Sequence, residues 1–217
     1  MGGSVYFFVP NLIGYVRVAL NFVALHYALS DYRVSLACYA ASALLDAADG
    51  YAARALGQSS LFGTVLDMVT DRTATACLCV VLAHLYPAYL VHFCALITLD
   101  IFSHWAHVYA SALTMAATHK SSTNLIVRLY YHKPVLFCVC AGNELFYMFL
   151  YLHAFAPGPV VTTLDVPFFA RPVRCTATAA AVLAVAPVFA FKQLTNVLQM
   201  VIAFADINAY ERARKAE

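Results

Sequence analysis

Four aspartates in one short stretch of the chain have the spacing of a metal site. The stretch covers residues 44–72, reads LLDAADGYAARALGQSSLFGTVLDMVTDR and also holds two arginines. Asp46 and Asp49 are three residues apart, and Asp67 and Asp71 are four apart, so each pair would share one face of a helix. Carboxylate oxygens are the ligands that divalent cations such as Mg²⁺ and Mn²⁺ prefer. The sequence therefore predicts two acidic helix faces that can bind metal.

A turn near residues 57–60 should make these two helices antiparallel and bring the acidic faces together. Counted from the middle of the turn, Asp49 and Asp67 lie about nine residues away and Asp46 and Asp71 about twelve, or roughly 13 to 19 Å at about 1.5 Å per residue. Four carboxylates at one depth repel one another strongly, which predicts that cations bind between them. Two ions about 4 Å apart, bridged by carboxylates, are typical of enzymes that displace a group at phosphorus. We therefore expect two Mg²⁺ or Mn²⁺ ions and a substrate that carries phosphate.

Small residues and arginines accompany the acidic faces. Gly50, Ala53 and Gly63 lie beside them, where their small size lets helix backbones and a ligand approach closely. Arg54 could pair with a phosphate. For Arg17, in the preceding apolar segment, the sequence leaves two interpretations open, contact with a phosphate or neutralisation of the acidic cluster. A set of ion pairs between helices is an alternative for the whole stretch, but four acids against two arginines are poorly balanced for that purpose.

The composition of the chain is that of a membrane protein. Of its 217 residues, 63% are hydrophobic and 11% are charged, whereas about 25% are charged in typical soluble domains. Apolar runs long enough to cross a hydrocarbon core of about 30 Å recur along the chain. The sequence therefore predicts an all-α integral membrane protein, one domain over residues 1–217, with a polar active-site cavity that opens to the cytosol. The six predicted transmembrane helices cover approximately residues 9–30, 33–56, 60–86, 87–111, 133–156 and 174–207.

Charges outside the acidic stretch indicate how these helices are oriented. With six crossings both termini lie on one side, and that side carries most of the basic residues, so the positive-inside rule places the termini in the cytosol. The connection over residues 114–134 is long and polar enough to hold a short interfacial helix. The formal net charge of +2 is too small to indicate a nucleic-acid partner.

The acidic stretch resembles the signature of the CDP-alcohol phosphotransferases, a family of membrane enzymes with six transmembrane helices that typically form homodimers. The signature is D-x-x-D-G-x-x-A-R-x8-G-x3-D-x3-D. The chain matches all of its fixed positions, which are Asp46, Asp49, Gly50, Ala53, Arg54, Gly63, Asp67 and Asp71. Other stretches, among them FFVPNLIGYVRV near the start and LDIFSHWAHV from residue 99, are similar to eukaryotic members that use inositol as the acceptor.

This resemblance implies a reaction in which CDP-diacylglycerol and myo-inositol give phosphatidylinositol and CMP, in the membrane of the endoplasmic reticulum. In the family the first and third aspartates bridge two metals, the second holds one metal, and the fourth holds the other metal and accepts a proton. The corresponding positions here are Asp46, Asp67, Asp49 and Asp71, respectively, with Asp71 as the catalytic residue. The residues implied to contact the CDP-lipid are Gly50, Ala53, Arg54, Ser60 and Asn11.

A pocket for inositol needs several hydrogen-bonding side chains, because inositol carries many hydroxyl groups and no charge. Polar residues in or next to apolar segments are the candidates, since such residues are costly in a membrane unless they are satisfied. The predicted inositol-binding residues are Asp100, His104, Lys120, Arg128 and Glu144. The alternative for Asp100 and Glu144 is a structural pair, either with each other or with Lys192.

Two other functions stay open from the sequence. A member of the same family with another acceptor alcohol, such as glycerol phosphate, serine or inositol phosphate, would carry the same signature. An ion channel or transporter would also hold carboxylates inside a membrane. Against the channel or transporter, the chain has no visible inverted repeat, and the fixed spacing of Gly, Ala and Arg favours an enzyme.

Overall fold

The computed structural model describes residues 4–114, 129–130, 132–164 and 173–216 of the chain. The chain divides into two compact units, Met1–Pro87 and Ala88–Glu217. Helices make up most of both units, as the sequence predicts. Each unit has its own packed helices.

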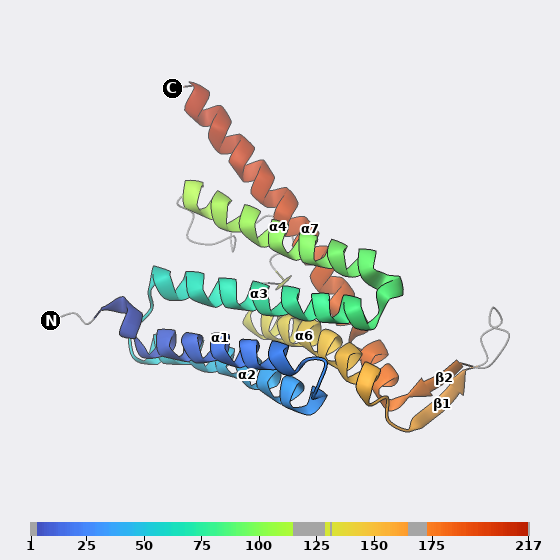
Figure 1. Cartoon of the computed structure of the whole chain (residues 1–217). Helices are drawn as coiled ribbons and strands as arrows, with labels where there is room; N and C mark the ends of the chain where they lie inside the picture. The colour runs from blue at the N-terminus through green and yellow to red at the C-terminus, as the bar shows by residue number, and fades with distance from the viewer. Residues whose placement is uncertain (1–3, 115–128, 131, 165–172, 217) are drawn as a thin grey trace. The chain divides into compact units, whose positions relative to one another are not determined.

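The first unit consists of three long helices (Figure 1). A short 3₁₀ helix, η1 (Val5–Phe7), precedes α1 (Val9–Tyr27), and α2 (Tyr32–Ala55) and α3 (Leu61–Leu85) follow. Helix α1 packs against both α2 and α3. The two helices that carry the acidic residues are therefore held by a shared third helix.

Local signals in the sequence explain where these helices begin and end. The Asp31 side chain caps α2 by accepting from the backbone N–H groups of Arg33 and Val34. Gly57 adopts a positive φ of 62° directly after α2, a conformation that favours glycine. The Ser60 hydroxyl then accepts from the Gly63 backbone N–H at 3.0 Å and starts α3. The predicted turn between the acidic helices is confirmed.

One face of α1 carries the packing against α3. Asn11, Gly14 and Arg17 follow one another at intervals of three residues, and all three are buried. A Cβ atom on Gly14 would lie 2.8 Å from the Leu66 side chain, and one on Gly63 would lie 2.7 Å from the Asn11 Oδ1 atom. The close approach of α1 and α3 thus depends on one glycine from each helix.

The second unit is built around its last helix. It contains α4 (Leu90–Thr114), α6 (Lys133–Phe155) and α7 (Ala177–Ala216), and the short 3₁₀ helix η2 (Pro87–Tyr89) lies at the boundary between the units. Helix α7 packs against both α4 and α6. Phe189 of α7 stacks on Phe146 of α6 with 3.9 Å between ring centroids. Near the other end of α7, small side chains form the contact with α4, namely Ala106, Ala110 and Ala203.

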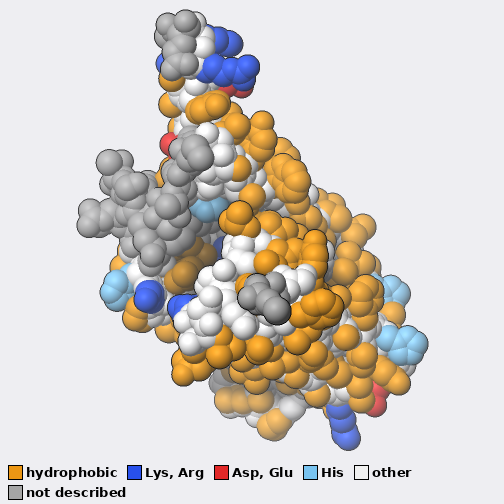
Figure 2. All heavy atoms as spheres, turned by 90° about the vertical axis from the view of Figure 1, so that its left-hand side faces the viewer, with side chains coloured by type: hydrophobic (Ala, Val, Ile, Leu, Met, Phe, Trp, Pro, Cys, Tyr) orange, Lys and Arg blue, Asp and Glu red, His pale blue; other side chains and the backbone are white. Residues whose placement is uncertain are grey.

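Three of the long helices suit a membrane. The segments Pro87–Leu113, Lys133–Phe155 and Ala177–Lys215 are long and apolar enough to cross one, judged by length and composition over the described residues. Hydrophobic side chains cover much of the molecular face in Figure 2, and many large ones are exposed, such as Trp105 at 72% and Leu183 at 61%. That α1, α2 and α3 also cross the membrane stays a prediction, as do a cavity open to the cytosol and a single domain.

The start of the last helix was predicted wrongly. Helix α7 begins at Ala177 rather than at residue 174, because the residues before it form the strand β2 (Val173–Thr176). This strand pairs antiparallel with β1 (Val160–Leu164), which is rich in β-branched residues that suit a strand. Helix α7 also continues past residue 207, to Ala216. The predicted interfacial helix lies almost entirely outside the described residues.

Candidate functional site

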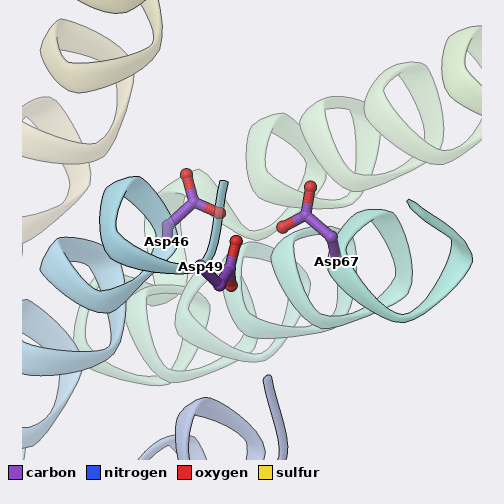
Figure 3. A group of neighbouring side chains, drawn as sticks. All are labelled: Asp46, Asp49 and Asp67. Atoms are coloured by element: carbon purple, nitrogen blue, oxygen red, sulfur yellow. The ribbon is translucent and has the colours of Figure 1, made fainter. Parts of the chain in front are cut away.

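Three carboxylates from two helices converge in the first unit. Asp46 and Asp49 of α2 and Asp67 of α3 point toward one another (Figure 3), and each offers an oxygen that lies within 4.8 Å of the other two. The Asp49 side chain is 12% exposed, whereas those of Asp46 and Asp67 are 43% and 46% exposed. The cluster is therefore buried at Asp49 and open to its surroundings at Asp46 and Asp67.

The buried Arg17 side chain joins a fourth carboxylate to this cluster. Its Nη1 atom donates to Asp49 Oδ2 and to Asp67 Oδ1, both at 2.7 Å, and its Nη2 atom lies 2.8 Å from Asp46 Oδ1. Nη2 also donates to Asp71 Oδ1. All four predicted metal ligands thus gather around one point, as the spacing of the sequence predicts.

Of the two interpretations left open for Arg17, the structure shows neutralisation of the acidic cluster. The ion-pair alternative is realised in part, but by an arginine of α1 rather than by those of the acidic stretch. Arg72 contributes only at the edge, with its Nη2 atom 3.7 Å from Asp71 Oδ2. The sequence did not decide this point, because the spacing within α2 and α3 does not say which neighbouring helix packs against them.

The donor set of the cluster fits a divalent metal. Arg17 and, at the edge, Arg72 offset at most two of four negative charges, so the four carboxylates keep an excess of negative charge. Hard carboxylate oxygens on two facing helices suit Mg²⁺ or Mn²⁺ rather than a soft metal. Arg17 itself marks the place where positive charge is stabilised. Asp46, Asp49, Asp67 and Asp71 are therefore the residues that could hold such ions.

Arg54 and Gly50 lie together beside the cluster, near the end of α2. Arg54 is exposed, and a Cβ atom on Gly50 would lie 3.4 Å from its Nη1 atom. Ala53 is half-buried in the same helical turn. Within the part of the chain that the structure describes, Arg54 has no ion-pair partner. Its charge is thus available to an anion.

The two other predicted CDP-lipid residues make contacts within the fold. Asn11 is 2% exposed, and its Nδ2 atom donates to the Val5 carbonyl at 2.6 Å, which ties η1 to the start of α1. The Ser60 hydroxyl oxygen caps α3 through Gly63. Both side chains therefore shape the end of the first unit from which α3 starts. Their predicted contact with the CDP-lipid is a separate proposal.

A second group of polar side chains lies among the apolar helices of the second unit. The His104 Nδ1 atom lies 3.5 Å from Asp100 Oδ1 within α4. The Asn196 amide of α7 donates to the same Asp100 oxygen at 3.4 Å, and the Lys192 ammonium donates to Asn196 Oδ1 at 2.6 Å. Lys192 also lies over the Tyr130 ring, 5.4 Å from its centroid. We call Asp100, His104, Lys192 and Asn196 the α4–α7 polar network.

Asn196 is not among the site residues predicted from the sequence, although the sequence holds a signal for it. Lys192 and Asn196 are four residues apart in a polar stretch of α7 that also holds Gln193, Thr195 and Gln199, and they are 3% and 1% exposed. Polar residues with this spacing share a helical face, so they could have been grouped with Asp100. The structural alternative for Asp100 is met in a modified form, since Asn196 connects it to Lys192.

Of the other predicted inositol residues, the structure describes Glu144, which lies on α6. Glu144 of α6 accepts from the Asn143 amide at 3.3 Å, and Asn143 in turn accepts from the Gln193 amide of α7 at 3.0 Å. This chain of amides connects α6 to α7. Lys120 and Arg128 lie outside the described residues.

Comparison with known proteins gives a consistent result along the chain. The family model described as CDP-alcohol phosphatidyltransferase matches residues 7–207. The human protein named CDP-diacylglycerol--inositol 3-phosphatidyltransferase is 39% identical, with 98% of each chain covered. The protein of the same name from Schizosaccharomyces pombe is 43% identical, over 92% of this chain and 88% of the relative. The one from Drosophila melanogaster is 46% identical, over 73% of this chain and 70% of the relative. No solved structure gives a significant match.

Proposed function

Because the chain belongs to the CDP-alcohol phosphatidyltransferase family, with a match over residues 7–207, we propose that it transfers a phosphatidyl group from CDP-diacylglycerol to myo-inositol. The products are phosphatidylinositol and CMP. Relatives from animals and fungi that carry the name of this activity support the choice of substrates, one of them over 98% of the chain. The observation that supports the chemistry is the convergence of four carboxylates from α2 and α3 around one point.

The four carboxylates would hold two divalent cations, Mg²⁺ or Mn²⁺. By the family pattern, Asp46 and Asp67 would contribute to both ions, Asp49 would contribute to one of them and Asp71 to the other. When bound, such ions neutralise charge on the pyrophosphate of the CDP-lipid. The buried position of Asp49 and the exposed edges of Asp46 and Asp67 fit a site that is anchored on one side and open to substrate on the other.

Asp71 is the proposed general base. Its side chain is 34% exposed, so a substrate hydroxyl can approach it. Asp71 accepts a proton from an inositol hydroxyl, and the oxygen attacks the phosphorus atom that bears diacylglycerol. The bond from that phosphorus to the oxygen of CMP breaks, and CMP leaves with the electron pair. The same carboxylate thus completes the metal site and receives the proton.

The CDP-lipid would be held beside the carboxylates by Gly50, Ala53, Arg54, Ser60 and Asn11. Arg54 is the strongest candidate among them, because it is exposed and has no ion-pair partner in the described part of the chain. Its guanidinium can pair with a phosphate of the pyrophosphate in a bidentate way. Gly50 lies directly beside that side chain, since a Cβ there would be in van der Waals contact with Arg54 Nη1 at 3.4 Å.

Inositol would be bound through its hydroxyl groups. Asp100 and His104 of α4 lie together and offer a carboxylate and an imidazole, which suits a polyol. Glu144 is the third described candidate, and Lys120 and Arg128 complete the proposed set. A polar site of this kind discriminates between acceptors, since a wrong alcohol leaves polar groups unpaired.

The setting of the reaction follows from the apolar helices. Three segments that are long and apolar enough to cross a membrane support a membrane enzyme, as a lipid substrate requires. We further propose that it acts in the endoplasmic reticulum, as a homodimer, with the active site facing the cytosol.

Purified full-length protein in lipid nanodiscs tests the proposal directly. CMP release is measured with CDP-diacylglycerol, Mg²⁺ or Mn²⁺, and one alcohol at a time: myo-inositol, glycerol phosphate, serine or inositol phosphate. Release with myo-inositol alone is the expected result. Release with another alcohol alone would refute the choice of acceptor. If no alcohol in this set gives CMP release, the proposal that the protein is a transferase is refuted.

A further inference from the structure

We propose that Arg17 is an exchangeable counter-cation, which competes with divalent metal for the four carboxylates and leaves them when metal binds. The inference rests on the proposed metal site and concerns a residue to which the reaction scheme gives no role. It makes the affinity for metal a property of α1 as well as of the four aspartates.

The first argument is that Arg17 and a metal need the same oxygens. The Arg17 nitrogens lie 2.7 to 2.8 Å from oxygens of Asp46, Asp49 and Asp67. These three residues also form the group whose oxygens lie within 4.8 Å of one another. A divalent cation such as Mg²⁺ would sit about 2.1 Å from each ligand oxygen. The guanidinium and the ion therefore cannot occupy the space between these carboxylates together.

The second argument is that Arg17 is incompletely satisfied where it lies. Its side chain is 2% exposed, and its Nε atom is buried without a hydrogen-bond partner among the described residues. A buried donor without an acceptor is unfavourable. The only other such side-chain atom in the described part of the chain is Asn21 Oδ1, an acceptor four residues further along α1.

These two atoms indicate where the side chain can go. Positions four residues apart share one face of a helix, so Asn21 lies on the same face of α1 as Arg17, about 6 Å further along the axis. A rotamer change that takes the guanidinium away from the carboxylates can bring an unsatisfied donor toward an unsatisfied acceptor. Asn21 Oδ1 is therefore the acceptor that we assign to the displaced arginine.

The third argument is the charge. Arg17 offsets only one of four negative charges, whereas two divalent ions would offset all four. Arg17 thus lowers the repulsion among the carboxylates, but it neutralises less of their negative charge than two divalent ions would. Exchange is favourable only when enough metal is present, which sets a threshold for loading the site.

The experiment compares wild type, Arg17→Met and Arg33→Met as full-length proteins in nanodiscs. Arg33→Met is the control for loss of one positive charge, because Arg33 is exposed and lies thirteen residues before Asp46, about 20 Å along the helix at about 1.5 Å per residue. Mn²⁺ binding is measured by electron paramagnetic resonance of the free ion. Thermal unfolding is measured with EDTA and with saturating Mn²⁺.

Arg17→Met should bind Mn²⁺ at least about fivefold more tightly than wild type, the lower end of the usual coupling between two ligands. Its unfolding temperature should fall in EDTA and recover with saturating Mn²⁺. Arg33→Met should match wild type in both measurements. Equal or weaker Mn²⁺ binding by Arg17→Met would overturn the inference, because a competitor cannot be removed without raising the affinity.

A second measurement covers the case in which Arg17→Met does not fold. Protein labelled with ¹⁵N at arginine Nε is titrated with diamagnetic Mg²⁺, and the Arg17 resonance is identified by its loss in Arg17→Lys. The resonance should shift as Mg²⁺ saturates, and an unchanged resonance would overturn the inference. Wild type that makes phosphatidylinositol but shows no exchange refutes the role of Arg17 alone. Wild type that binds neither ion refutes the proposed metal site as well.

Discussion

Replacement of Asp71 by asparagine separates the chemistry of the site from its stability. The variant keeps the size of the side chain and removes its negative charge and its ability to accept a proton. Loss of a general base typically lowers the rate by a factor of about 10² to 10⁴. Because Asp71 is also a proposed metal ligand, we expect a loss of at least about 10³-fold, which corresponds to about 4 kcal/mol in the activation free energy.

The same variant should not be less stable than wild type. Arg17 would still bond to Asp46, Asp49 and Asp67, at the distances of 2.7 to 2.8 Å that it has in the structure. Removal of one of four negative charges also lowers the repulsion within the cluster. The unfolding temperature measured in EDTA should therefore be unchanged or higher than that of wild type.

The assay follows CMP release from CDP-diacylglycerol with inositol, and binding of the CDP-lipid is measured separately and should stay detectable. The control is Asp31→Ala, which removes the N-cap of α2 and should cost about 1 kcal/mol of stability while turnover is retained. Near wild-type turnover in Asp71→Asn would refute the assignment of the base. A fall in stability in step with activity would show instead that Asp71 is structural.

Three further perturbations test other parts of the structure. Chelation of divalent ions by EDTA should abolish CMP release, and Mg²⁺ or Mn²⁺ should restore it. Ca²⁺ is the comparison ion in this restoration, because its ligand distances are longer than those of Mg²⁺. Arg54→Gln should raise the KM for CDP-diacylglycerol about tenfold or more, as expected for loss of a charge-assisted pair, and Arg33→Gln should not; equal KM values in both variants would contradict a phosphate contact. Gly142→Ala should destabilise the protein by about 1 to 2 kcal/mol, because its Cβ would lie 2.5 Å from Val188 Cγ1 and the cost of overpacking exceeds the gain in helix propensity; the double variant with Val188→Ala should recover most of the loss in thermal unfolding.

The boundaries of α2 and α3 could be predicted from local chemistry, because the residues that end helices act on their own neighbours. Gly57 with its positive φ and the Ser60 cap end α2 and start α3 close to the predicted turn. The hairpin of β1 and β2 could not be found in this way. Its pairing, such as Leu164 with Val173, joins residues on either side of a proline-containing stretch, and the pairing of two short strands leaves no periodic pattern in the sequence.

The carboxylates of the site could be predicted because their arrangement depends on two periodic elements and one turn. Spacings of three and four place each acidic pair on a face, and the turn fixes the depth at which the faces meet. The partner of the carboxylates could not be predicted, since it comes from a third helix whose rotation depends on packing. Arg17 reaches the cluster because Gly14 and Gly63 let α1 lie close to α3.

One face of α1 therefore both packs the first unit and supplies charge to its acidic cluster. Asn11 fixes the start of the helix and touches Gly63, Gly14 admits Leu66, and Arg17 bonds to carboxylates of both α2 and α3. At the same turn, the Arg17 carbonyl accepts from the Ser42 hydroxyl of α2 at 3.3 Å. A change that rotates α1 would thus move the guanidinium and the packing glycines together. Because α1 packs against both acidic helices, its position affects how their carboxylates face one another. Substitutions on the buried face of α1 should therefore alter metal affinity even where they touch no carboxylate.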